Sequence, residues 1–272
     1  MIVLRFGVIF LALFYISVLA FGESAENYLV VLGALLGIGY GFYWLAFNVL
    51  TFEITEPETR DFFNGFLGTL TSAGGMIGPI LAGFIISRFA SYKGYTIVFG
   101  LSLLLFAVAV LLSFFLKRRP ASGRYLFLRI LEERKNNANW RFITNAHFFQ
   151  GLREGTFIFI ISVFVFISTG SEFAIGTFGL INSGIAFVGY YIASRVIKKK
   201  FRKKAILLGG ILLYLAIFLI VFDVTYTKLL LYAGMIAIAY PILLVPYISM
   251  TYDVIGTGWN AAEMRIEYIV VR

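Results

Sequence analysis

The chain has 272 residues, of which 60% are hydrophobic, 18% are aromatic and only 14% are charged. A soluble domain cannot bury so large an apolar fraction, so the composition predicts an all-α polytopic membrane protein whose first partner is the lipid bilayer. The net charge of +9 is concentrated in two short segments between long apolar runs, which is typical of cytoplasmic loops and not of nucleic-acid binding. Because the sequence has no cysteine, disulfides and thiolate metal sites are excluded.

Eight apolar stretches are long enough to cross a bilayer, which takes about 20 residues. In chain order they are 3–21, 28–52, 62–88, 94–116, 142–168, 173–194, 205–222 and 228–252. The third is rich in glycine and the fifth carries charges, so these two are the least regular spans. The sequence predicts eight transmembrane helices.

One long linker, 117–141, divides the chain. It separates an N-terminal half-bundle of four spans (1–116) from a C-terminal half-bundle (142–272), which holds four spans and the start of a fifth. The apolar residues from Leu126 to Leu131 could form a short interfacial helix. A solvated tether with some helix is the favoured interpretation of the linker.

Basic residues indicate which ends of the spans face the cytoplasm. The linker carries eight Lys and Arg against two Glu, and the segment 195–204 carries seven Lys and Arg. Two spans separate these segments, so both lie on the same side, and the positive-inside rule makes that side cytoplasmic. We therefore expect a multi-pass protein of the cell (plasma) membrane with both termini in the cytoplasm.

Two parts of the sequence resemble each other at an offset of 200 residues. Tyr40, Thr51, Phe52, Glu53 and Ile54 correspond to Tyr240, Thr251, Tyr252, Asp253 and Val254. A parallel repeat of this size in an apolar chain predicts a duplicated membrane bundle. Each repeat ends at the cytoplasmic end of its helix, where we expect Glu53 and Asp253 to pair with loop cations.

The fifth span contains an unusual set of polar residues. They are Asn145, His147, Gln150, Arg153 and Glu154. Glu154 lies ~18 Å into the span at 1.5 Å per residue, near the middle of a ~30 Å hydrocarbon core. A charge there costs roughly 2.5–3.5 kcal/mol, which favours a functional role. His147, Gln150 and Glu154 share one helix face, on which Glu154 would accept a proton or cation, His147 would titrate and Gln150 would form hydrogen bonds.

Arg153 is predicted to point elsewhere, because neighbouring residues project about 100° apart on a helix. We expect it to pair with a residue on another helix. An alternative places the span nearer its C-terminus, so that Arg153 reaches back to the cytoplasmic surface and anchors the helix there.

The third span contains the motif Gly74-x-x-x-Gly78-Pro79-x-x-Ala82-Gly83. Its small residues at i, i+4 and i+8 predict a smooth face for close helix contact, and Pro79 permits a kink. The motif resembles the helix-five motif of drug/proton antiporters in the major facilitator superfamily, with Ala82 in place of one Gly. Four spans, a basic linker and four further spans with a 200-residue repeat also resemble that family. Ordinary tight packing in a membrane helix is the alternative for the glycines.

The resemblance implies two six-helix halves, of which this chain would supply helices three to ten. Helices four and ten line the central cavity in the family, which makes Trp44, Asn48, Tyr240 and Tyr247 candidate substrate contacts. Asn182, in the middle of the sixth span, is a further candidate. Aromatic side chains at helical spacing are more often packing residues, and this alternative stays open for them.

Two family signatures are incomplete in this sequence. The arginine that the family places four residues before Gly37 is replaced by Gly33. The basic loop after helix eight corresponds to 189–204, which keeps its cations but lacks the aspartate of the family pattern. Both a charge-based latch and a plain basic loop therefore remain open for this segment.

These features favour secondary active transport of a small solute by alternating access, with proton-coupled efflux suggested by Glu154 and by the glycine motif. The alternative is an incomplete, non-transporting membrane fragment of a truncated or misannotated gene. An enzyme is not expected, since His147 is the only histidine and no nucleophile–base pair is evident. No nucleotide-binding G-x-x-x-x-G-K-[ST] motif, cofactor site or metal site is predicted.

Overall fold

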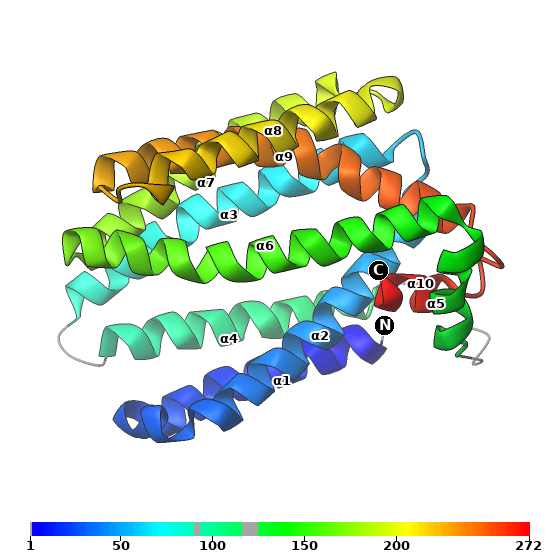
Figure 1. Ribbon diagram of the computed structural model, residues 1–272. Helices are drawn as coiled ribbons and strands as arrows, with labels where there is room; N and C mark the ends of the chain where they lie inside the picture. Colours follow the sequence, from blue (N-terminus) through cyan, green and yellow to red (C-terminus); the bar gives the residue numbers. More distant parts are fainter. Residues whose placement is uncertain (1, 90–92, 116–124) are drawn as a thin grey trace. The chain divides into compact units, whose positions relative to one another are not determined.

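The computed structural model describes residues 2–89, 93–115 and 125–272, and these residues form helices without any strand (Figure 1). The helices are α1 (Ile2–Phe21), η1 (Gly22–Tyr28), α2 (Leu29–Ile54), α3 (Arg60–Arg88), α4 (Lys93–Ser113), α5 (Phe127–Asn136), α6 (Ala138–Thr169), α7 (Glu172–Val196), η2 (Lys199–Phe201), α8 (Arg202–Val221), α9 (Tyr226–Gly256) and α10 (Arg265–Val271). Among them, eight are long and apolar enough to cross a membrane. The predicted all-α fold and its eight spans are confirmed.

The linker contains the short helix α5. Its Ile130 is fully buried, and the Trp140 indole nitrogen donates a hydrogen bond of 3.0 Å to the Ile130 carbonyl. The carboxylate of Glu133 accepts a hydrogen bond from the backbone nitrogen of Trp259. The helix expected in part of the linker is therefore present and is held against α6 and the segment after α9. The predicted linker residues 117–124 lie outside the described part of the chain.

The helices form two compact units. One contains Met1–Ile54, Ala82–Phe127 and Ala262–Val271, and the other contains Thr55–Leu81, Leu128–Ala261 and Arg272. The boundary between these units passes through α3 just after Pro79, and the division into half-bundles at the linker stays a prediction.

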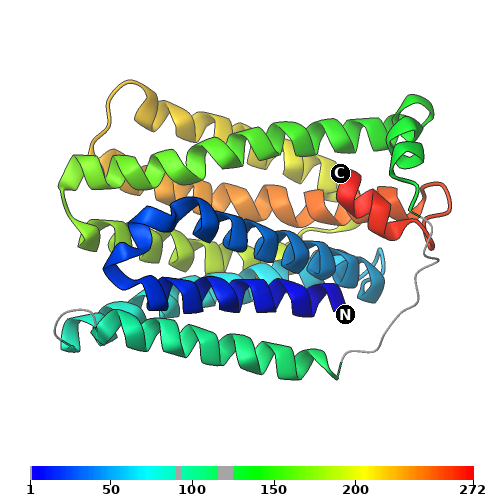
Figure 2. The same ribbon diagram turned by 90° about the horizontal axis from the view of Figure 1, so that it is seen from below.

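In the first unit, α1 lies between α2 and α4 (Figure 2). The approach of α1 to α2 is close because glycine occupies the contact. A Cβ atom at Gly7 would lie 2.6 Å from the backbone nitrogen of Tyr43, and one at Gly39 would lie 2.9 Å from Cγ of Leu11. Small residues let membrane helices approach and gain van der Waals contact, which replaces the hydrophobic effect inside lipid.

The acid at the end of α2 has a partner within the same unit. Glu53 forms an ion pair with Arg265 at the start of α10, and both side chains are nearly buried. The structural pairing expected for Glu53 is confirmed, and its cation is Arg265, which follows α9 in the sequence.

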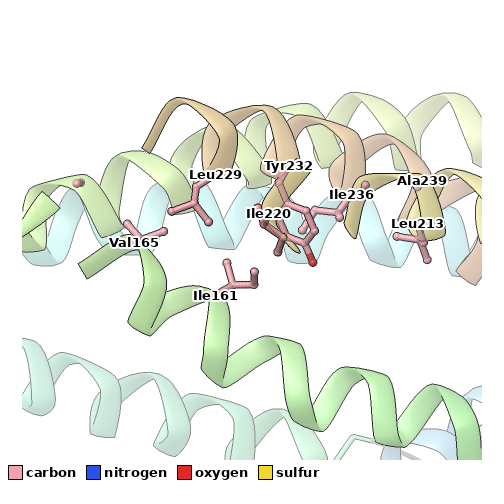
Figure 3. Packing of buried hydrophobic residues seen from close by; sticks show 10 residues of the cluster. Ile161, Val165, Leu213, Ile220, Leu229, Tyr232, Ile236 and Ala239 are labelled. Carbon is pink, nitrogen blue, oxygen red and sulfur yellow. The ribbon is translucent and has the colours of Figure 1, made fainter. Parts of the chain in front are cut away.

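In the second unit, α9 is the central helix and packs against α6, α7 and α8. Its buried face contributes to a core that also includes residues of α6 and α8 (Figure 3). The labelled members are Ile161, Val165, Leu213, Ile220, Leu229, Tyr232, Ile236 and Ala239. Gly209 brings α8 onto the backbone of Leu243, and Gly189 brings α7 onto Pro241. These contacts fix the rotation of α9 and thereby the position of its polar side chains.

Candidate functional site

Polar residues of α6 form contacts inside the second unit. Gln150 donates a hydrogen bond of 2.6 Å from its amide nitrogen to the carboxylate of Glu154, one helical turn further on. The His147 ring lies 3.3 Å from the Thr251 hydroxyl and packs against the ring of Tyr247, with 4.8 Å between centroids. The structure therefore joins Gln150 to Glu154 and directs His147 toward α9.

Arg153 contacts the middle of α9. Its Nη1 donates a hydrogen bond of 2.8 Å to the hydroxyl of Tyr240, and its guanidinium lies 4.9 Å from the centre of the same ring. Phe157 packs on the guanidinium at 5.8 Å. The expected partner on another helix is thus Tyr240. Since Tyr240 is the fifteenth of the 31 residues of α9, Arg153 engages that helix at its midpoint and not at an end.

Arg153 and Glu154 of α6 carry no ion pair in the described part of the chain. The ion pairs of the described residues join other acidic and basic side chains. The Nε atom of Arg153 is buried and has no hydrogen-bond acceptor there. A charge in a membrane span is costly unless it meets an opposite charge, a hydrogen-bonding group or water. Within the described residues, their side-chain hydrogen bonds are therefore with the neutral groups of Tyr240 and Gln150.

Two further predicted residues have unsatisfied polar atoms. The hydroxyl of Tyr247 on α9 and the amide oxygen of Asn182 on α7 are buried, and neither has a hydrogen-bond partner among the described residues. An unsatisfied buried polar atom costs about 1–3 kcal/mol, so such atoms call for an explanation. Both belong to the unit that holds Glu154.

The predicted residues of α2 belong to the other unit. The Asn48 side chain donates a hydrogen bond of 2.7 Å to the Trp44 carbonyl on the same helix. Trp44 packs edge-on against Tyr43 and Phe47 and is half exposed. The structure does not bring Trp44 and Asn48 into one unit with the α6 residues, and their role as substrate contacts stays a prediction.

Among the described residues, no atom packs closely on the glycines of the α3 motif, and the helix contact that their spacing predicts stays a prediction. Within the described residues, a Cβ atom at Gly74, Gly78 or Gly83 would have no neighbour within 4 Å. Ala82 follows the point where the two units divide. Pro79 lies inside a continuous helix. Because its nitrogen carries no hydrogen, one carbonyl in the preceding turn lacks its helical hydrogen-bond donor.

The close contacts of α3 lie on a different face. A Cβ atom added at Gly65 would lie 2.3 Å from Ser194 Cβ, and one added at Gly68 would lie 2.3 Å from the Tyr190 ring. A Cβ atom added at Gly75 would lie 2.7 Å from Ser183 Oγ. The first half of α3 therefore packs on α7 through these other glycines, because this is the face that turns toward α7.

A buried charge network joins the start of α3, the start of α8 and the end of α9. Arg202 donates from Nε to both carboxylate oxygens of Asp61 at 2.9 and 2.8 Å, and from Nη1 to Asp253 at 2.6 Å. Arg60 forms an ion pair with the other oxygen of Asp253. Arg202 also donates to the Pro57 carbonyl at 3.0 Å. Two arginines and two aspartates thus neutralise one another.

The sequence predicts only part of this network. The expected pairing of Asp253 with loop cations is confirmed, whereas the sequence leaves both a latch and a plain basic loop open for the segment that contains Arg202. The segment 189–204 lacks the aspartate of the family pattern, and Asp61 of α3 supplies the carboxylate that pairs with Arg202 instead. Adjacent Arg60 and Asp61 at the start of an apolar span were the available signal, since charges at that position need partners.

The family comparison agrees with this architecture. Residues 1–263 match the sequence profile described as Major Facilitator Superfamily. The chain belongs to this family. It is similar to an uncharacterized protein, YqgE, of Bacillus subtilis (strain 168), with 66% identity over 270 residues. That match covers 99% of the chain and 63% of the relative, so the chain spans less than two thirds of YqgE's length.

A second relative is an uncharacterized protein in the sodM 3'region of Geobacillus stearothermophilus. It is 71% identical over 98 residues, which are 36% of this chain and 46% of that protein. No solved structure matches the chain. Membership of the superfamily agrees with the eight long apolar helices of the structure.

Proposed function

We propose that this protein is a secondary transporter that exports a small solute in exchange for protons. The observation that carries the proposal is a carboxyl group, Glu154, inside an apolar helix, where it accepts a hydrogen bond from the neutral amide of Gln150. The family supplies the transport activity, and Glu154 supplies the coupling to protons.

Glu154 suits a proton carrier because its two protonation states have different costs inside a membrane. A carboxylate in the hydrocarbon core costs roughly 2.5–3.5 kcal/mol, and protonation removes that cost. The hydrogen bond from Gln150 stabilises the charged form without cancelling its charge. The group can therefore take up a proton from one side and release it to the other as its access to water changes.

Arg153 holds α6 to α9 at the same depth. Its hydrogen-bond partner Tyr240 comes directly before Pro241 in α9, and Pro246 follows in the same helix. Proline removes helical hydrogen bonds and allows a helix to bend. A change in the bend of α9 would move Tyr240 relative to Arg153, and this would change the surroundings of Glu154. We propose this as the link between the solute site and the proton site.

The network of Arg60, Asp61, Arg202 and Asp253 serves in this proposal as a latch on the cytoplasmic side. It ties the ends of three helices together, and those ends must separate before the cytoplasmic side can open. Removing one partner from a buried ion pair costs about 3–5 kcal/mol, which is enough to bias a conformational equilibrium strongly.

Solute-driven proton movement in inverted membrane vesicles tests the proposal. The vesicles are acidified inside, and probe solutes are added in series, beginning with ethidium as a cation and continuing with neutral and anionic compounds. Wild-type protein is expected to release protons when a transported solute is added. Glu154→Gln should abolish this release, whereas Glu132→Gln, an exposed acid in α5, should leave it unchanged. Solute uptake without any proton release would rule out the coupling.

A further inference from the structure

An open apolar groove runs along the outside of the second unit between α7 and α8, with α9 as its floor. Its volume is about 840 Å³, and its lining is apolar except for Lys204 at one end. Val188 and Ile192 of α7, Leu208 of α8 and Ile238 of α9 line it and are each about half exposed, at 53%, 51%, 51% and 50%. The groove can therefore be entered from the surroundings of the protein.

The length of the groove matches one leaflet of a bilayer. Its α7 wall extends from Gly184 to Val196, which is ~18 Å at 1.5 Å per residue. The hydrocarbon core is ~30 Å thick, so one leaflet contributes about half of that. Lys204 lies in the first turn of α8, beside the Val196 end of the groove. An extended acyl chain would fit along the groove with its head group near this lysine.

Positive charge gathers at the same end. Lys200, Lys203 and Lys204 are exposed, and none of them forms an ion pair within the described residues. Lys200 lies over the ring of Phe201, another lining residue, at 4.8 Å. Arg202 points the other way into the buried network. Basic pockets between membrane helices bind anionic lipid head groups, and each lysine near a membrane surface adds measurably to that attraction.

We propose that this groove binds one acyl chain of an anionic phospholipid, with the lipid phosphate against Lys204. The apolar lining selects a hydrocarbon chain, and the lysines select a negative head group over a zwitterionic one. The site is separate from Glu154 and does not depend on the transport mechanism.

Native mass spectrometry of the purified protein tests this site. Phosphatidylglycerol and phosphatidylcholine with identical chains are titrated separately, and the bound lipid is counted from the mass. Wild-type protein should bind phosphatidylglycerol at least fivefold more tightly. Lys204→Gln should weaken phosphatidylglycerol binding by about fivefold and leave phosphatidylcholine unchanged. Lys135→Gln, an exposed lysine of α5, is the matched control and should change neither.

Filling the groove gives a second, independent variant. Val188→Trp should remove bound lipid of both kinds, whereas Leu104→Trp, on an exposed face of α4, should not. Equal binding of both lipids by wild-type protein would overturn the proposal without any variant. A dimer that Val188→Trp dissociates would also overturn it, because the groove would then hold a second copy of the chain.

Discussion

Arg202 and Asp61 form a buried two-oxygen ion pair across 141 residues of sequence, and Asp253 completes the contact with Arg202 at 2.6 Å. This pair connects the first turn of α3 to the first turn of α8. Both side chains are less than 10% exposed, so the attraction is only weakly screened by water.

Asp61→Asn should destabilise the protein by about 3–5 kcal/mol, because it leaves a buried guanidinium with less negative charge around it. The remaining contact with Asp253 places the expected loss at the lower end of that range. Unfolding in mixed micelles with increasing dodecyl sulfate, followed by tryptophan fluorescence, measures the change. Glu58→Gln is the control, since Glu58 and Lys199 are exposed and 3.9 Å apart. It should cost less than about 1 kcal/mol. Equal effects of the two variants would contradict the buried network.

Tyr240→Phe should cost about 1–2 kcal/mol by removing the acceptor of the Arg153 hydrogen bond while keeping the ring beneath the guanidinium. The same substitution in an Arg153→Met background should cost little, because the partner is already gone. Free energies of unfolding of the four proteins complete the cycle. Tyr214→Phe, at an exposed tyrosine of α8, provides the comparison for hydroxyl loss. Additive costs would show that Arg153 and Tyr240 do not interact.

Gly68→Ala should cost about 1–3 kcal/mol, because the new methyl group would lie 2.3 Å from the Tyr190 ring and force α3 away from α7. Gly74→Ala on the same helix is the matched control, since no described atom lies within 4 Å of its new methyl group. Thermal unfolding in detergent distinguishes the two. If Gly74→Ala were the more damaging change, the close face of α3 would be the one that the glycine motif predicts.

Most of the fold could be predicted from local sequence because each span is a long apolar run. The eight helices follow from run length alone, and their ends in the structure agree with the predicted spans to within a few residues. The contact of Gln150 with Glu154 also follows from spacing, since residues four apart share a helix face.

The partners on other helices could not be predicted in the same way. Whether Arg153 meets Tyr240, or α3 uses Gly68 instead of Gly74, depends on the rotation of each helix about its own axis. That rotation is set by packing at residues such as Gly189 and Gly209, which bring α7 and α8 onto α9. The pairing of Arg202 with Asp61 joins two helix ends that are far apart in sequence. The pattern of residues within either segment therefore cannot predict it.

The most direct test of proton coupling separates solute movement from proton movement in a single variant. In liposomes, Glu154→Gln is compared with wild-type protein in equilibrium exchange of a transported solute without a proton gradient, and in accumulation driven by a gradient. We predict that the variant retains exchange and loses driven accumulation, because the solute path is intact and the proton carrier is gone. Driven accumulation at the wild-type rate in Glu154→Gln would contradict the account.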